Sequence, residues 1–163
     1  MRAVGGVTGS GNIGTSPTPV AVQIETDTSD ASLVFWGSIF ANTFTKLGPG
    51  QFTLTGSNSL IDVSVNEGKL SLKNSLALGS SGTVSIAGSA ELNLDYSLTA
   101  GSQFSRSIDT VVGGQSGHSI LSCSQDCVLT GQISLSNDLR LLAQSSPSPV
   151  ITVDLNGAVV NSV

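Results

Sequence analysis

The segment with the most chemically versatile side chains runs from His118 to Cys127 and reads HSILSCSQDC. It contains the sole histidine of the chain, both cysteines (Cys123 and Cys127) and Asp126. Imidazole, thiolate and carboxylate groups at such short spacing are typical zinc ligands. Zinc sites usually combine two close pairs of ligands, however, and the chain has no second Cys or His pair. We therefore expect no metal here.

Two further chemistries remain open for the same segment. A Cys or Ser nucleophile could use His118 as its general base, but this needs a pocket that a chain of small polar residues does not indicate. Alternatively, Cys123 and Cys127 could form a disulfide, because a three-residue gap can be bridged where the chain bends. In an oxidising compartment we expect this bond rather than two free thiols, with a modest stabilisation of about 2 kcal/mol. We expect no catalytic residue.

Two other places carry candidate binding groups. Glu25, Asp27 and Asp30 lie in one polar stretch and could hold a hard cation such as calcium. Their spacing is not that of a twelve-residue calcium loop, which favours a solvated loop. Trp36 is the only tryptophan, and it is a candidate for stacking on a sugar ring or another ligand. Such a residue more often fills a core or caps an end.

The elements that must position these groups are short alternating runs between Thr45 and Tyr96. Aliphatic residues alternate with polar ones in QFTL, KLSL and ELNL, and a period of two places them on one face of a strand. The runs recur at roughly 20-residue spacing, which is typical of stacked solenoid repeats. Evenly spaced short strands also suit a β-sandwich. The near-identical units and the lack of a clear hairpin turn favour an all-β parallel β-helix, with the sandwich as the alternative.

Outside this stretch the pattern predicts further strands with less regular spacing. They are expected at Val20–Ile24, at Leu33–Trp36, around Arg106 between Phe104 and Val112, and at Val150–Leu155. Asn137–Asp138 could cap a short helix through Leu142. We predict a strand there instead, because the flanking units alternate.

Length and charge narrow the classes of function. The 163 residues suffice for one domain with a core. The net charge is −5, and the six Lys and Arg residues are scattered, which argues against nucleic acid and against anionic membrane surfaces. No apolar run approaches the ~18 residues of a membrane helix, so we expect no membrane insertion by this chain.

The stretch from Phe35 to Tyr96 resembles the autotransporter-associated β-strand repeat of bacterial autotransporter passenger domains. The matching pieces are Gly37-Ser38-Ile39, Thr45-Lys46-Leu47-Gly48-Pro49-Gly50, Phe52-Thr53-Leu54-Thr55-Gly56-Ser57-Asn58, Asn66-Glu67-Gly68-Lys69-Leu70-Ser71-Leu72 and Leu76-Ala77-Leu78-Gly79-Ser80-Ser81-Gly82-Thr83-Val84. The chain departs from the family at Leu60-Ile61-Asp62, where an aromatic residue and a Gly-Gly turn are common.

The resemblance implies a right-handed parallel β-helix at the bacterial surface or secreted beyond the outer membrane. It also implies two partners outside this chain, namely neighbouring passenger segments and an outer-membrane translocator barrel. Passengers of this kind tend to have few cysteines that lie close together, as Cys123 and Cys127 do here. No apolar signal segment follows Met1, so we expect residues 1–163 to be one β-solenoid segment of a longer passenger.

The function expected from this resemblance is structural, as a stalk or adhesin scaffold with no cofactor. One alternative is a module that binds a glycan or a host protein. A less favoured alternative is a polysaccharide-degrading β-helix enzyme, which would need two facing carboxylates. Asp62 and Asp95 lie in strand regions, but nothing in the sequence aligns them. We therefore expect no enzyme.

Overall fold

The computed structural model describes residues 2–4, 11–14, 20–96, 103–112, 117–144, 150–153 and 159–161, with side chains omitted for 2–4 and 159–161. Every regular element in these ranges is a β-strand. The strands are β1 Arg2–Val4, β2 Ala21–Glu25, β3 Ser32–Phe35, β4 Phe40–Leu47, β5 Gln51–Leu54, β6 Ser59–Val65, β7 Lys69–Leu72, β8 Thr83–Ala87, β9 Glu91–Leu94, β10 Ser107–Val111, β11 Ser119–Cys123, β12 Cys127–Leu129, β13 Ile133–Leu135, β14 Leu139–Ala143, β15 Ile151–Val153 and β16 Val159–Asn161.

The strands form three parallel sheets around one core. The first has the order β1-β2-β4-β6-β8-β10-β13-β16, the second β14-β11-β9-β7-β5-β3, and the short third β12-β15. All pairings between these strands are parallel. This confirms the parallel β-helix and excludes the β-sandwich, whose sheets are antiparallel.

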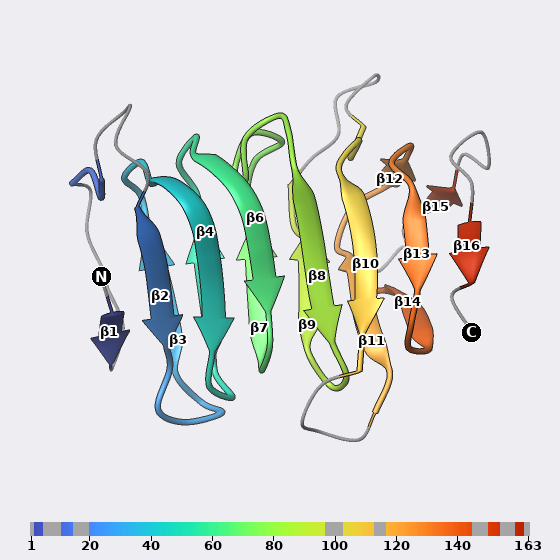
Figure 1. The fold of residues 1–163 in the computed structure, drawn as a ribbon, viewed down its shortest axis with the longest axis horizontal. Coiled ribbons are helices and arrows are strands. Elements are labelled where there is room, and N and C mark those ends of the chain that lie inside the picture. The colour runs from blue at the N-terminus through green and yellow to red at the C-terminus, as the bar shows by residue number, and fades with distance from the viewer. Residues whose placement is uncertain are drawn as a thin grey trace.

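The chain coils in one direction from its N-terminal to its C-terminal side. In Figure 1 the strands of the first sheet run downward in front and those of the second sheet run upward behind. The chain advances from left to right at the same time, so the coil is right-handed. Each circuit through the sheets forms one coil of the solenoid. Among the described residues, no helix has the length and apolar character needed to cross a membrane.

The repeated units recognised in the sequence stack directly on one another. Phe52 of β5 faces Leu70 of β7, which faces Leu92 of β9, which in turn faces Leu121 of β11. The coil from Phe52 to Leu70 spans fewer residues than the one from Leu92 to Leu121, although the paired residues keep the same alternation. The alternation of apolar and polar residues therefore sets the register, and coils of different length stack in it.

The core is a continuous column of apolar side chains. Leu70 and Leu92 are fully buried, and the rings of Phe44 and Phe52 stack with centroids 6.2 Å apart. Burial of one such leucine side chain stabilises the fold by about 1.5–3 kcal/mol. One coil cannot bury its inner face alone, so each coil depends on its neighbours.

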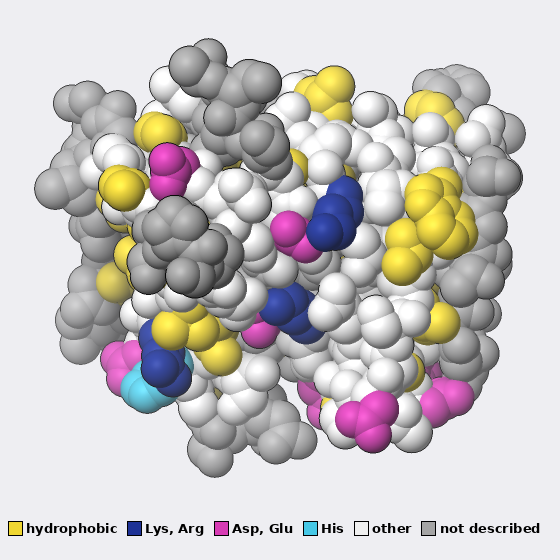
Figure 2. Space-filling model, turned by 180° about the vertical axis from the view of Figure 1, so that it is seen from behind, with side chains coloured by type: hydrophobic (Ala, Val, Ile, Leu, Met, Phe, Trp, Pro, Cys, Tyr) yellow, Lys and Arg dark blue, Asp and Glu magenta, His cyan; other side chains and the backbone are white. Residues whose placement is uncertain are grey.

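The outer face of the second sheet is polar at β7 and β9. Lys69 of β7 pairs with Glu91 of β9 at 2.9 Å, and Lys73 pairs with Asp95. Figure 2 views this side of the molecule, where basic and acidic side chains lie next to each other among uncharged atoms. Between the two ion pairs, Asn93 donates a weak hydrogen bond of 3.4 Å to a serine hydroxyl on β7. Polar contacts thus continue across the strands as the apolar contacts do inside.

Most predicted strands outside the central stretch are present with shifted ends. The strand preferred over a helix at Leu139–Leu141 is confirmed by β14. The strand predicted between Phe104 and Val112 is present as β10, but it begins only at Ser107, and Phe104 makes an isolated bridge to Leu129. Arg106 instead turns inward at a corner. The predicted strand at Val150–Leu155 is present as β15, and its last two residues lie outside the described ranges.

Candidate functional site

The two cysteines form a disulfide that crosses a corner of the core. Cys123 ends β11 on the second sheet, Cys127 begins β12 on the third, and their Cα atoms are 6.3 Å apart. Both residues are buried, with exposed fractions of 0% and 3%. As bonded residues they offer neither a thiolate nucleophile nor a metal ligand.

His118 lies away from the disulfide, at the opposite end of β11. Its side chain is 59% exposed, and its Nδ1 lies 3.5 Å from an Oδ of Asp138. Among the described residues, no group of three or more His, Cys, Asp or Glu side chains is placed to hold a metal ion. The structure therefore joins His118 to Asp138, a residue that the sequence reasoning did not connect with it.

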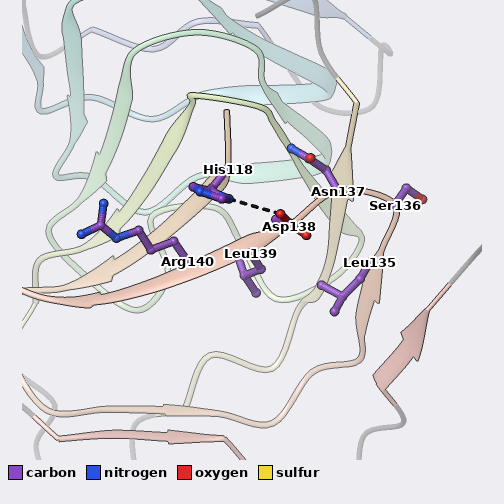
Figure 3. A pocket seen from close by; sticks show the side chains of 7 residues that line it. All are labelled: His118, Leu135, Ser136, Asn137, Asp138, Leu139 and Arg140. Atoms are coloured by element: carbon purple, nitrogen blue, oxygen red, sulfur yellow. Dashed lines mark ion pairs between the residues drawn. The ribbon is translucent and has the colours of Figure 1, made fainter. Parts of the chain in front are cut away.

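An open cavity of about 720 Å³ surrounds this pair at the corner between β13 and β14 (Figure 3). Asn137 anchors the corner, because its side-chain amide donates to the carbonyl of Gly117 at 2.9 Å. Its backbone N–H also donates to Oγ1 of Thr110, a buried residue of β10. The lining residues are His118, Leu135, Ser136, Asn137, Asp138, Leu139 and Arg140.

The cavity does not assemble a nucleophile with a base. Figure 3 shows the Ser136 side chain pointing away from His118, on the far side of Asp138. Ser119 follows His118 in the chain, but its buried hydroxyl donates to the carbonyl of Ile86 at 2.7 Å. A triad would need a serine hydroxyl within hydrogen-bond reach of the imidazole. The arrangement of His118, Asp138 and Arg140 instead offers charge and hydrogen bonds to a ligand.

The carboxylates considered for glycoside hydrolysis are not brought together. Asp62 lies on β6 of the first sheet, whereas Asp95 directly follows β9 of the second. Glu91 and Asp95 share the outer face of the second sheet but are four residues apart on one extended segment, about 13 Å along the backbone. Paired carboxylates in glycosidases are about 5–10 Å apart.

Trp36 lies just after β3, at the N-terminal end of the second sheet, and 59% of it is exposed. The cavity beside β14 is at the opposite end of that sheet. The two candidate binding features are therefore separate, and a ligand-stacking role for Trp36 stays a prediction. Glu25, Asp27 and Asp30 lie within or after β2, in the segment that leads to β3.

A fully buried lysine stabilises one corner of the solenoid. Lys46 points inward from β4, and its Nζ donates to Oγ1 of Thr26 at 3.1 Å and to the carbonyls of Leu47, Gly48 and Glu67 at 2.9, 2.7 and 3.2 Å. Burial lowers the pKa of Lys46 to about 8, while the Glu67 carboxylate opposes this effect. Gly48 has a φ of +76° here, and a Cβ on it would lie 1.9 Å from the Thr26 carbonyl oxygen.

A buried arginine joins three coils. Arg106 is 4% exposed, and its Nη1 donates to the carbonyls of Leu60 and Leu78, both at 2.8 Å. Its Nη2 donates to the carbonyls of Ile61 at 2.5 Å and Thr83 at 3.3 Å. Burial lowers the pKa of the Arg106 guanidinium, and Asp62 acts in the opposite direction.

Sequence reasoning treated Lys46 and Arg106 as ordinary scattered cations, although one signal was available. Lys46 is two residues after the buried Phe44, and Arg106 is two residues before the buried Ile108. In an alternating segment, residues two apart point to the same face, so both cations are expected to point inward. Both cations therefore occupy inward positions, Lys46 near the end of β4 and Arg106 just before β10, and both donate to backbone carbonyls of the corners.

The fold and these sites define the chain as a parallel β-solenoid with buried cations at its corners. Comparison with protein-family models, curated proteins and solved structures gives no match for the chain.

Proposed function

We propose that the chain is a structural segment of a bacterial cell-surface or secreted passenger, serving as a stalk or adhesin scaffold. The observation that carries this proposal is the continuous apolar column, in which Phe52, Leu70, Leu92 and Leu121 stack coil upon coil. Such stacking produces a stiff unit that lengthens by adding coils and displays its corners outward. The resemblance of Phe35–Tyr96 to passenger repeats supports the surface setting.

Two further features agree with this setting. A disulfide between Cys123 and Cys127 is the kind of bond that persists in oxidising compartments. On the outer face of β7 and β9, ion pairs and hydrogen bonds between polar side chains take the place of an apolar surface patch.

The test is an immunoblot of the native producing cells, with and without protease treatment of intact cells. We expect a band far larger than 16.4 kDa that the protease removes, while a cytoplasmic control protein remains. A protected band near 16.4 kDa would refute the proposal and indicate a small intracellular β-protein.

A second candidate function is recognition of a glycan or a host protein. The observation that favours it is the open cavity beside β14, where His118 and Arg140 are both exposed. A glycan array with Arg140→Ala and Trp36→Ala as separate variants tests it. Loss of signal in one variant assigns the binding surface, and equal signals from both variants and the wild type would reject both surfaces.

A further inference from the structure

Four neighbouring strands of the second sheet, β3, β5, β7 and β9, end along one line of the outer face. Figure 1 shows the second sheet behind the first, with its strands running upward to these ends. The last inward residues of the four strands pair with one another and are buried: Phe35, Leu54, Leu72 and Leu94. Successive residues of an extended chain point to opposite faces, so the next residue of each strand points outward. These outward residues form the outer row: Trp36, Thr55, Lys73 and Asp95.

The outer row keeps the register of the strands that it follows. The backbone N–H groups of Thr55, Lys73 and Asp95 donate to carbonyls of the preceding coil at 3.1, 2.9 and 2.8 Å, which continues the ladder by one residue. A Cβ on Gly37 would lie 1.8 Å from a carbonyl oxygen of the preceding coil, so only glycine fits directly after Trp36. Trp36 is therefore attached to a closely packed backbone, although 59% of it is exposed. This backbone is in place before a ligand arrives, which lowers the ordering cost of binding.

The polar part of the outer row offers a donor and an acceptor side by side. Lys73 and Asp95 form an ion pair, and 47% of the lysine side chain and 26% of the aspartate side chain are exposed. The Thr55 hydroxyl donates to the carbonyl of Phe35 at 3.1 Å, which leaves its oxygen able to accept a hydrogen bond. Because a hydroxyl is both donor and acceptor, two adjacent sugar hydroxyls can accept from the Lys73 ammonium and donate to the Asp95 carboxylate. The two charges balance, which favours a neutral ligand over a charged one.

We propose that the outer row binds a neutral, extended glycan, with one sugar ring on Trp36 and the following units over Thr55 and the Lys73–Asp95 pair. The apolar C–H face of a sugar ring covers the exposed indole, while the hydroxyls remain available at the ring edge. Neighbouring strands are about 4.7–4.9 Å apart, close to the length of one sugar unit, so the glycan crosses the strands with about one unit per strand. This inference rests on the second candidate function, glycan recognition, and assigns it to a surface other than the cavity beside His118.

Trp36 is the only tryptophan of the chain, so tryptophan fluorescence reports on this row alone. The test titrates the chain with neutral oligosaccharides of increasing length that have β-1,3, β-1,4 or α-1,4 linkages. Binding is read by tryptophan emission and, in parallel, by isothermal titration calorimetry. We expect a saturable shift of the emission to shorter wavelength, with an affinity that rises up to about four sugar units, one per strand, and then levels off. Oligogalacturonate, the charged comparison, should bind at least about tenfold more weakly.

Two variants complete the design without altering the fluorescent residue. Lys73→Met removes the ammonium group from the outer row and should weaken binding about tenfold, equivalent to about 1.4 kcal/mol. Lys69→Met is the matched control, because it breaks the other ion pair of the same face, to Glu91, and lies outside the row. It should leave the affinity unchanged.

Three outcomes would overturn the inference. Equal affinities for Lys73→Met and the wild type would remove the polar part of the site. Heat of binding without a change in the emission of Trp36 would leave glycan recognition in place at another surface. No heat with any of the oligosaccharides would leave a host protein as the ligand of the second candidate function.

Discussion

Replacing Lys46 by methionine removes the buried ammonium group while keeping an unbranched side chain of similar length. The buried carbonyl of Gly48 loses its lysine donor at a cost of about 1–3 kcal/mol. The carbonyl of Glu67 is partly exposed, so water can replace the lysine as its donor. The carbonyl of Leu47 still accepts a hydrogen bond of 3.1 Å from the backbone N–H of Thr26. Relief from burying a charge offsets this cost. We expect the free energy of unfolding at neutral pH to change by less than about 2 kcal/mol.

The difference between the wild type and Lys46→Met should grow with pH. Lys46 has a pKa of about 8 in the folded chain and an ordinary value of 10.5. Between these pH values the folded state has released a proton that the unfolded state still holds, so rising pH favours folding. The wild type should gain at most about 1.4 kcal/mol per pH unit relative to the variant, and at most about 3 kcal/mol in all.

The assay is urea denaturation of both proteins from about pH 7 to about pH 10.5, with the difference in unfolding free energy plotted against pH. Lys69→Met is the matched control, because that lysine is ion-paired on the outer face and 23% of its side chain is exposed. Its curve should run nearly parallel to that of the wild type. A constant difference between the wild type and Lys46→Met over this range would refute the assignment of a lowered pKa to Lys46.

Three further outcomes can be checked with the same urea assay. Leu92→Ala should lower the unfolding free energy by about 2–5 kcal/mol, because Leu92 is fully buried in the apolar column, whereas Ile61→Ala, at 47% exposure, should cost less than about 1 kcal/mol. Asn58→Leu should cost about 2–4 kcal/mol, because it removes bonds to the Ile39 N–H and the Ala77 carbonyl, and a loss below about 1 kcal/mol would contradict this role. Reduction of the Cys123–Cys127 disulfide should cost about 2 kcal/mol, and no change on reduction would show that the small loop adds nothing.

The central strands could be predicted because their residues alternate without interruption. QFTL, KLSL and ELNL became β5, β7 and β9, in the register that their spacing suggests. The same regularity favoured parallel stacking over a sandwich, since near-identical units align when coils repeat in one direction. Strand ends were less predictable, as at Arg106, because the alternating pattern continues beyond the strand into the bend that precedes β10.

The candidate sites were much harder to predict, because they depend on contacts between coils. His118 and Asp138 are 20 residues apart in the chain and meet because β11 and β14 are neighbours in the second sheet. The guanidinium of Arg106 is likewise held by backbone carbonyls from two earlier coils. Corner lengths vary along the chain, so alternation alone does not tell which corners become adjacent.

The guanidinium of Arg106 also has a consequence for how the solenoid comes apart. A stack held by contacts between neighbours frays from its ends, losing one coil at a time. Fraying from the C-terminal side that reaches β10 must break four guanidinium bonds together, two of them to residues of the β6 strand. Arg106 therefore opposes further unfolding of the coils at this point. Amide hydrogens of β11 to β14 should exchange with solvent well before those of β6 to β9. The C-terminal coils would then open often, while the coils before Arg106 would open slowly.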